Sequence, residues 1–318
     1  MALLKPNSVY VANGVTVNEK IIPDGTRWQD AEKAKRAGFK ANALYKKQAK
    51  LCKTGKAAKV TIHNTDDLKG VDDDAEQYTR ATYNENMGSV RVHYYVDDLG
   101  AWQNLRAGCG GTKSDPLNTA EVSWHSGDGS VVDGGNMTSL SIEVIMNDNK
   151  THDEKAKDNA ARLTAWLLWK HGLDIDDLVT HTYWVNKSVG RKFTDVDEQC
   201  CSPVSGQKWC PTYIFASSNK SVAMRNWKAF KQLVKGYLDN LNNFKEDAKP
   251  SEIPYLVRIN TSVLNIRKQP TTKSAIVGAI RDRGVYTIVE ESDGAGATKW
   301  GKLKSGAGWI SLDYTKRM

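Results

Sequence analysis

Residues 59–65 read KVTIHNT, an apolar and β-branched run that ends at His63. The β-branched residues favour an extended backbone, so Val60–Ile62 is predicted to be a strand. A histidine directly after a strand lies where functional side chains are commonly held on a rigid scaffold. A single histidine in such a place is more often a hydrogen-bonded core residue. Its role therefore depends on what the fold brings beside it.

Two further soft metal ligands follow at similar junctions. His181 comes directly after the apolar run at 178–180, and Cys210 lies in the turn 208–211. Imidazole nitrogen and thiolate sulfur bind zinc, and catalytic zinc sites keep three protein ligands while a water fills the fourth position. Such a water is a usable nucleophile near neutral pH. We therefore predict a Zn2+ cofactor held by His63, His181 and Cys210.

Outside these junctions the chain alternates between strand and helix patterns. Strands are predicted at 90–96 and 140–146, a returning strand begins at 100–105, and helices are predicted at 74–86, 153–171 and 222–241. The helix at 153–171 has an apolar side, and Gly172 is its predicted stop. Strands interleaved with helices indicate an α/β fold.

The two ends of the chain differ in pattern from this middle part. Residues 1–55 are basic and helix-prone, and they are predicted to pack as an N-terminal extension of a catalytic domain spanning 1–241. Residues 242–253 are polar, contain Pro250 and are predicted to be a linker. From 254 to 318, short apolar runs broken by Pro and Gly predict a small all-β barrel. That last segment contains no His or Cys.

Composition narrows the class of protein. The 318 residues are 40% hydrophobic and 26% charged, as in an ordinary globular protein with room for two domains. No apolar run is long enough to span a bilayer, so stable membrane insertion is not expected. The 45 Lys and Arg against 37 Asp and Glu give a net charge of +8, which fits a solvated surface or attraction to a polyanion. No recognition motif points to nucleic acid as a partner.

The five cysteines do not indicate a disulfide framework. Their number is odd, and the first residues of the chain lack the apolar core of a signal peptide, which fits a reducing compartment. Cys200 and Cys201 are adjacent in a polar stretch near Cys210. A second metal site at these two cysteines would need another pair of ligands, and none lies nearby in the sequence. Free thiols in a loop are therefore the favoured interpretation.

Five motifs in the middle of the chain resemble one known family. VTIHNT, SWHSGDG, SLSIEVIMN, THTYW and KWCP follow one another between residues 55 and 215. Together they are similar to the type-2 N-acetylmuramoyl-L-alanine amidases, zinc enzymes of the peptidoglycan-recognition-protein type found in phage endolysins. The resemblance implies a mixed β-sheet with flanking helices. It also implies hydrolysis of the amide between N-acetylmuramic acid and the L-alanine of the stem peptide.

The resemblance gives catalytic roles to two charged residues. Glu143 lies inside an apolar run, where a carboxylate is costly unless it is paired or functional. In the family, the glutamate at this position takes a proton from the attacking water; the alternative is a buried salt bridge. Lys208 precedes Cys210 by two residues and could point its ammonium at the oxyanion of the tetrahedral intermediate. The alternative is an exposed loop lysine.

The resemblance also implies substrate contacts, and the chain differs from the family pattern at two places. His125 matches a WHAG-like motif and is expected to line the substrate groove, with Trp124 as an apolar wall and Asn64 bonding the stem peptide. Several relatives carry a catalytic tyrosine where this chain has Val92, which puts that role in doubt. The stretch 184–206 is longer than the spacing of close relatives and is expected to shape one lip of the groove.

The C-terminal segment resembles a second family. VLNIRKQP, VGAI and GWISLDY, within 254–318, look like the bacterial SH3 domains attached to cell-wall hydrolases, and this implies wall binding. Bacterial peptidoglycan is thus the expected partner, together with anionic wall polymers. The protein is expected to be made in the host cytoplasm and to act at the cell wall after release.

Three functions stay open from the sequence. The leading hypothesis is a two-domain peptidoglycan amidase. The others are a peptidoglycan-recognition protein that binds without cutting, and a zinc endopeptidase that cuts within the stem peptide. Non-catalytic members of the family usually lack the third ligand, so Cys210 favours an enzyme.

Overall fold

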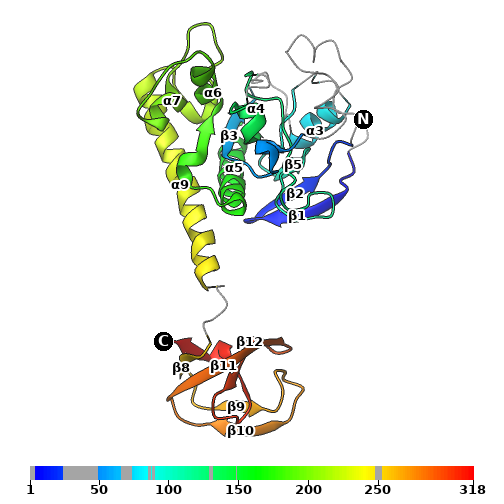
Figure 1. Cartoon of the computed structure of the whole chain (residues 1–318), viewed down its shortest axis with the longest axis vertical. Helices are drawn as coiled ribbons and strands as arrows, with labels where there is room; N and C mark the ends of the chain where they lie inside the picture. Colours follow the sequence, from blue (N-terminus) through cyan, green and yellow to red (C-terminus); the bar gives the residue numbers. More distant parts are fainter. Residues whose placement is uncertain are drawn as a thin grey trace. The chain divides into compact units, whose positions relative to one another are not determined.

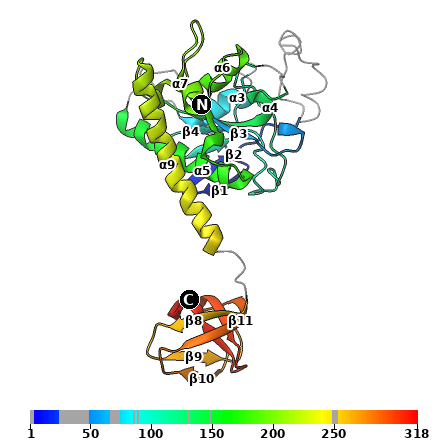
Figure 2. The same ribbon diagram turned by 60° about the vertical axis from the view of Figure 1, so that its left-hand side comes forward.

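The computed structural model divides the chain into two compact units, Met1–Asn242 and Asn243–Met318, called the N-terminal and C-terminal units below. Each is visible in Figures 1 and 2. The residues that the structure describes are 4–23, 49–65, 74–84, 87, 90–128, 132–147, 149–247 and 253–318. Residues 24–48, which make up much of the predicted helix-prone N-terminal extension, lie outside them.

The N-terminal unit is built on a seven-stranded mixed sheet in the order β1-β2-β5-β4-β6-β3-β7. Its strands are β1 Ser8–Ala12, β2 Val15–Glu19, β3 Lys59–Asn64, β4 Tyr94–Val96, β5 Ala101–Gln103, β6 Ser139–Val144 and β7 Leu178–Thr180. β3 is parallel to both β6 and β7, and β4 is parallel to β6, whereas β1–β2 and β4–β5 are antiparallel. The mixed sheet confirms the α/β prediction.

Helices cover this sheet. They are α3 Ala75–Tyr83, α4 Gly135–Thr138, α5 Lys150–His171, α6 His181–Ser188, α7 Val196–Cys201, α8 Thr212–Phe215 and α9 Lys220–Asp247, with 3-10 turns η1 Leu51–Lys53 and η2 Ile175–Asp177. α5 packs against β3, β4 and β6, while α4, α6 and α8 contact β3 (Figure 1). Five of the six β3 residues are buried, as expected for a central strand covered on both faces.

Local sequence signals explain where the long helices begin and end. Asp74 caps α3 by accepting a hydrogen bond from the Gln77 backbone N–H at 2.6 Å. Asn149 caps α5 in the same way, and Gly172 ends it with φ 70°, a left-handed conformation that glycine adopts without strain. α9 packs against the core of the N-terminal unit through buried residues as far as Leu238 and the partly buried Leu241, and it continues to Asp247 (Figure 2).

Several boundaries differ from the prediction. The strand expected at 90–96 begins only at Tyr94, because the Arg91 backbone N–H bonds the Trp124 carbonyl of a loop instead of a neighbouring strand. The helix expected to end at 86 ends at Tyr83, and residues 85 and 86 lie outside the described residues. α9 continues to Asp247, so residues 242–247 of the expected linker are helical; residues 248–252 lie outside the description.

The cysteines also differ from expectation. Cys200 and Cys201 were expected in a loop, but they form the last turn of α7 and are fully buried against the core of the N-terminal unit. Cys109 and Cys210 are buried as well, whereas Cys52 in η1 is half-buried. All five lie among the described residues, and none forms a disulfide.

The C-terminal unit is an all-β structure with strand order β10-β9-β13-β12-β11-β8-β14. Its strands are β8 Tyr255–Ile259, β9 Leu264–Arg267, β10 Ile276–Ile280, β11 Val285–Gly294, β12 Ala297–Leu303, β13 Trp309–Ser311 and β14 Thr315–Arg317. The 3-10 turn η3 Leu312–Tyr314 connects β13 to β14. Every strand pair is antiparallel. The short strands confirm the all-β prediction, and the SH3-type barrel stays a prediction.

Within the described residues, no helix combines the length and the hydropathy needed to cross a membrane.

Candidate active site

Three parallel strands converge on the site. In the register of β3 and β6, His63 is the partner of Glu143, and Ile62 of β3 is the partner of Thr180, the last residue of β7. His181 follows immediately as the first residue of α6. The carboxyl ends of neighbouring parallel strands are where open α/β sheets place their ligands. This arrangement therefore brings His63, Glu143 and His181 to one edge of the sheet.

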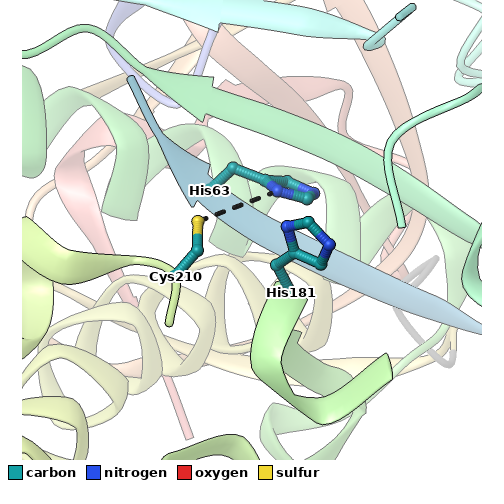
Figure 3. Close-up of side chains that lie close together, drawn as sticks. All are labelled: His63, His181 and Cys210. Atoms are coloured by element: carbon teal, nitrogen blue, oxygen red, sulfur yellow. Dashed lines mark hydrogen bonds between the residues drawn. The ribbon is translucent and has the colours of Figure 1, made fainter. Parts of the chain in front are cut away.

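The predicted ligand trio is brought together at this edge. One ligand atom from each of His63, His181 and Cys210 lies within 4.8 Å of the other two. The Cys210 Sγ is 4.0 Å from His63 Nδ1, and the two imidazole ring centres are 4.9 Å apart. Figure 3 shows the side chains converging from β3, from the start of α6 and from the loop before α8.

The electrostatics of the two histidines suit a metal. Burial, then the charges of His181, His125 and Lys208, hold the pKa of His63 well below its usual value. Burial and the Lys208 charge lower the pKa of His181 to about 4. Both rings are therefore neutral at pH 7, with a nitrogen lone pair available, as metal binding requires. Two neutral imidazoles and a thiol converging on one point fit zinc with one position left for a water or substrate.

Thr182 connects two of the ligands. Its Oγ1 accepts a hydrogen bond from the Cys210 backbone N–H at 3.0 Å and donates to the Cys210 carbonyl at 3.0 Å. The Thr182 backbone N–H also donates to that carbonyl at 3.2 Å. Because Thr182 directly follows His181, these three bonds hold the two ligands at a set separation. The sequence analysis missed this residue, and its polar character beside a ligand was the only signal.

A cavity of about 710 Å³ opens beside the three ligands. It is lined by His63, Thr65, Tyr78, Met87, Val90, Val92, Tyr95, His125, Glu143, His181 and Lys208. The lining combines apolar residues with the two ligand histidines and the two charged residues singled out from the sequence. Both Glu143 and Lys208 therefore have access to whatever the cavity binds.

Glu143 stands in a row of side chains that crosses three strands. In the parallel registers its partners are His63 on β3 and Tyr95 on β4. Residues in register on adjacent strands share a face of the sheet, so all three side chains face the cavity. The Tyr95 hydroxyl lies 2.9 Å from Thr82 Oγ1, and burial raises the pKa of Tyr95 above its usual value. Tyr95 was not singled out from the sequence.

The predicted substrate contacts fall into different places. His125 is 8% exposed, lines the cavity and also contacts His63. Trp124 is half-buried and is not among the residues that line the cavity.

Asn64 is 1% exposed, and its side chain is used inside the protein. Its Nδ2 donates to the Thr65 carbonyl and to Thr212 Oγ1, and its Oδ1 accepts from the Tyr213 backbone N–H. Asn64 thus ties the end of β3 to α8, directly after the Cys210 loop. This geometry favours a structural role over the expected bond to the stem peptide.

The stretch 184–206 is a helical insertion. It holds the rest of α6 and all of α7. The buried side chain of Asn186 donates to the carbonyls of Thr182, Gln199 and Ser202, which joins the two helices. No residue of 184–206 lines the cavity beside the ligands.

Comparisons with known proteins match the part of the chain that holds this site. The family model described as N-acetylmuramoyl-L-alanine amidase matches residues 53–212, which include all three ligands. The N-acetylmuramoyl-L-alanine amidase XlyA of Bacillus subtilis (strain 168) is 31% identical over 147 residues, 46% of this chain and 44% of XlyA. The amidase CwlH of the same organism is 33% identical over 140 residues, 43% of this chain and 49% of CwlH.

The chain spans about half the length of these curated relatives. Among solved structures, the catalytic domain of XlyA matches 69% of this chain and 99% of that domain, with 24% sequence identity and a TM-score of 0.45.

Proposed function

The chain belongs to the N-acetylmuramoyl-L-alanine amidase family, and we propose that it is a zinc-dependent peptidoglycan hydrolase of the endolysin type. Its substrate would be the amide between N-acetylmuramic acid and the L-alanine of the stem peptide. The convergence of His63, His181 and Cys210 beside a large cavity carries this proposal. Both curated relatives are named as N-acetylmuramoyl-L-alanine amidases.

We infer that zinc is the resident cofactor, held by His63, His181 and Cys210. When bound, it would supply a Lewis acid and lower the pKa of a water molecule in the site. The neutral state of both imidazoles supports this assignment, since protonated rings could not act as ligands.

Glu143 is the proposed general base and later general acid. Its carboxylate faces the cavity from the strand beside His63, so it can take a proton from the attacking water and pass it to the departing alanine amine. Because it is half-buried and lies one strand away from the ligands, its position is set by the sheet and not by a loop.

Lys208 is the proposed stabiliser of the oxyanion. Its side chain is exposed but lines the cavity, and its charge acts on both ligand histidines. A cation at this place would favour the negative charge that develops on the carbonyl oxygen during attack. His125 and the apolar residues that line the cavity are proposed to hold the substrate.

The C-terminal unit is proposed to be an SH3-like wall-binding domain. Its residues 254–318 contain no His or Cys, so no candidate metal or thiol chemistry lies in it. Holding the enzyme on an insoluble polymer would raise the concentration of substrate at the N-terminal unit. Anionic wall polymers suit the net charge of +8.

Digestion of purified cell wall tests the bond that is cut. We expect new N-terminal alanine and no new reducing sugar ends, with C210S as a matched inactive control. Reducing ends would indicate a glycosidase, and amino termini from other stem residues would indicate an endopeptidase. Binding to the wall without release of any fragment would indicate a recognition protein.

A further inference from the structure

We infer that His125 is a positioning residue for the metal centre: through one hydrogen bond it selects the tautomer and the orientation of His63. The consequence for zinc rests on the proposed function, but the hydrogen-bond arrangement does not. No substrate contact is needed for this role. It also gives a reason for a second buried histidine beside the ligands.

The geometry is a short chain of hydrogen bonds. His63 Nε2 lies 2.9 Å from His125 Nδ1, and His125 Nε2 lies 3.2 Å from the Gly135 carbonyl oxygen. The two rings meet edge to face, with centres 5.1 Å apart and an interplanar angle of 89°. This places the His63 edge toward the lone pair of His125, as a hydrogen bond along the plane of the ring requires.

Proton positions along this chain follow from its far end. A carbonyl oxygen can only accept, so the bond to Gly135 puts the His125 proton on Nε2. The Nδ1 of a neutral His125 is then an acceptor, and His63 must donate to it from a protonated Nε2. The lone pair of His63 is left on Nδ1. That nitrogen is the one 4.0 Å from the Cys210 Sγ, where the metal would lie.

Ser139 does not change this assignment. Its hydroxyl lies 3.4 Å from His125 Nε2, longer than the bond to Gly135, and can accept as well as donate. It is also 2.6 Å from Thr61 Oγ1, to which Trp184 Nε1 donates at 2.8 Å. The hydroxyl groups of Ser139 and Thr61 can therefore rotate to accept or donate as the proton on His125 requires.

The loop that carries His125 is held rigidly. Asn136 Oδ1 accepts from the backbone N–H groups of His125 and Ser126 at 2.8 and 2.9 Å. Gly135 packs so closely that a Cβ there would lie 2.7 Å from the Trp184 ring and 2.8 Å from Ser126 Cβ. The acceptor for His125 therefore cannot easily move away.

The second ligand histidine is supported differently. His181 bonds the backbone of Ser126, so no side chain can be removed to release it. The support of His63 is a side chain, which makes it testable by substitution. Groups in this position around metal sites typically alter metal affinity by about 10–100-fold when they are removed.

Two substitutions separate the acceptor from the rest of the ring. H125F keeps a flat ring without a hydrogen-bond acceptor. H125N places an amide oxygen near the former Nδ1, so it can still accept from His63. We expect zinc dissociation constants, measured without substrate by competition with a chromophoric chelator, to rise about 10–100-fold in H125F. H125N should recover most of this loss.

A second readout uses the metal-free protein. Long-range 1H–15N spectra of the histidine rings should show His63 protonated at Nε2 in the wild type, and a mixture of tautomers in H125F. Wild-type His63 protonated at Nδ1 would overturn the inference without any variant. So would wild-type zinc affinity in folded H125F. A change confined to KM for soluble muropeptide would make His125 a substrate contact only.

These outcomes are separable from those of the proposed function. Failure to release N-terminal alanine by the wild type would reject the amidase, yet it leaves the tautomer and zinc measurements unaffected. Conversely, an active amidase whose zinc affinity ignores H125F would reject the positioning role alone.

Discussion

β3 in the N-terminal unit and β8 in the C-terminal unit are both short strands, but their burial differs. β3 is buried at five of its six residues and ends in His63 and Asn64, whereas β8 alternates between exposed and buried residues. The difference extends to each unit. Buried polar and charged residues are numerous in the N-terminal unit, while Ser311 is the single one among the described residues of the C-terminal unit.

This difference in buried polar residues suggests different functions for the two units. A buried polar group costs free energy unless it is paired, so a fold accumulates such groups where it needs their chemistry. The N-terminal unit keeps His63, His125 and Glu143 inside or beside its sheet. The C-terminal unit has a conventional apolar core of eight buried residues and no histidine or cysteine. Reaction chemistry is therefore expected in the first unit and attachment in the second.

The largest expected effect is the loss of a ligand. C210A should bind zinc weakly and lose nearly all wall hydrolysis, because two imidazoles alone hold the metal poorly. Metal content and lysis rate on the same preparation measure this. C201A is the matched control, since it removes a buried thiol outside the ligand set and should keep its zinc. Full activity of metal-free wild type would contradict the zinc mechanism.

Removal of the proposed base should be the next largest effect. E143Q keeps the size of the side chain but cannot take a proton, so kcat should fall by about 10²–10⁴ while zinc content stays unchanged. Turnover of soluble muropeptide and metal analysis together measure this. A variant that unfolds, with unchanged specific activity in its folded fraction, would instead identify Glu143 as a structural residue.

Lys208 should have a smaller effect on turnover. K208M removes the charge but keeps most of the apolar stem, and kcat should fall by about 10²–10³, the scale for one oxyanion donor. K220M is the control, because Lys220 is an exposed lysine that pairs with Glu198 away from the cavity. If K208M changes KM alone, Lys208 binds substrate instead of stabilising the transition state.

Separating the units sharpens the comparison directly. A fragment 1–247, which keeps α9 whole, should hydrolyse soluble muropeptide at a rate similar to the full chain. On intact walls it should be slower, by up to about 10²-fold, because tethering no longer supplies an effective concentration. Residues 248–318 alone should sediment with walls without degrading them. A fragment that stays in the supernatant with walls of every susceptible species would reject the attachment role.

The smallest expected effect is a pH dependence confined to the N-terminal unit. The half-buried His171 accepts a hydrogen bond from the Ala57 N–H and donates one to the Ala107 carbonyl, and partial burial lowers its pKa. As the pH falls below about 6.5, His171 takes up a proton in the unfolded chain before it does so in the folded chain, so the free energy of unfolding decreases. For one group this decrease is at most about 1.4 kcal/mol per pH unit.

The substitution H171N isolates this contribution. The free energy of unfolding of the N-terminal unit should be lower in H171N at pH 7, and the gap to the wild type should narrow below pH 6.5. Hydrogen exchange resolved by peptide, corrected for intrinsic rates, measures both units in one sample. The C-terminal unit has no histidine, so its free energy of unfolding should not decrease in the same way below pH 6.5. A similar decrease there would contradict the comparison.

Local pattern was enough to predict the elements that carry the site. The β-branched run of β3, the apolar run of β6 and the capped helix α5 were all predicted near their observed positions. Each is specified by neighbouring residues. The convergence of the three ligands was predicted from their places at element ends, together with the family resemblance.

What sequence could not supply depends on contacts between distant segments. Arg91 bonds the carbonyl of Trp124, which delays the start of β4 despite an alternating apolar pattern. His125 and His63 are 62 residues apart, so nothing local indicated that one ring bonds the other. α7 was not predicted, because its sequence is mostly polar and does not indicate that its two cysteines are buried in the core.

The burial of the thiols has a practical consequence for labelling this protein. Thiolate is the reactive form of cysteine, and burial raises the pKa of Cys109, Cys200 and Cys201, that of Cys200 to about 12. Cys210 is buried as well and would be shielded further by a bound metal. Cys52 is the least buried of the five. Burial raises the pKa of Cys52 as well, so its advantage is access and not a more reactive thiolate. We therefore expect a fluorophore or spin label to react at Cys52 before the other four cysteines.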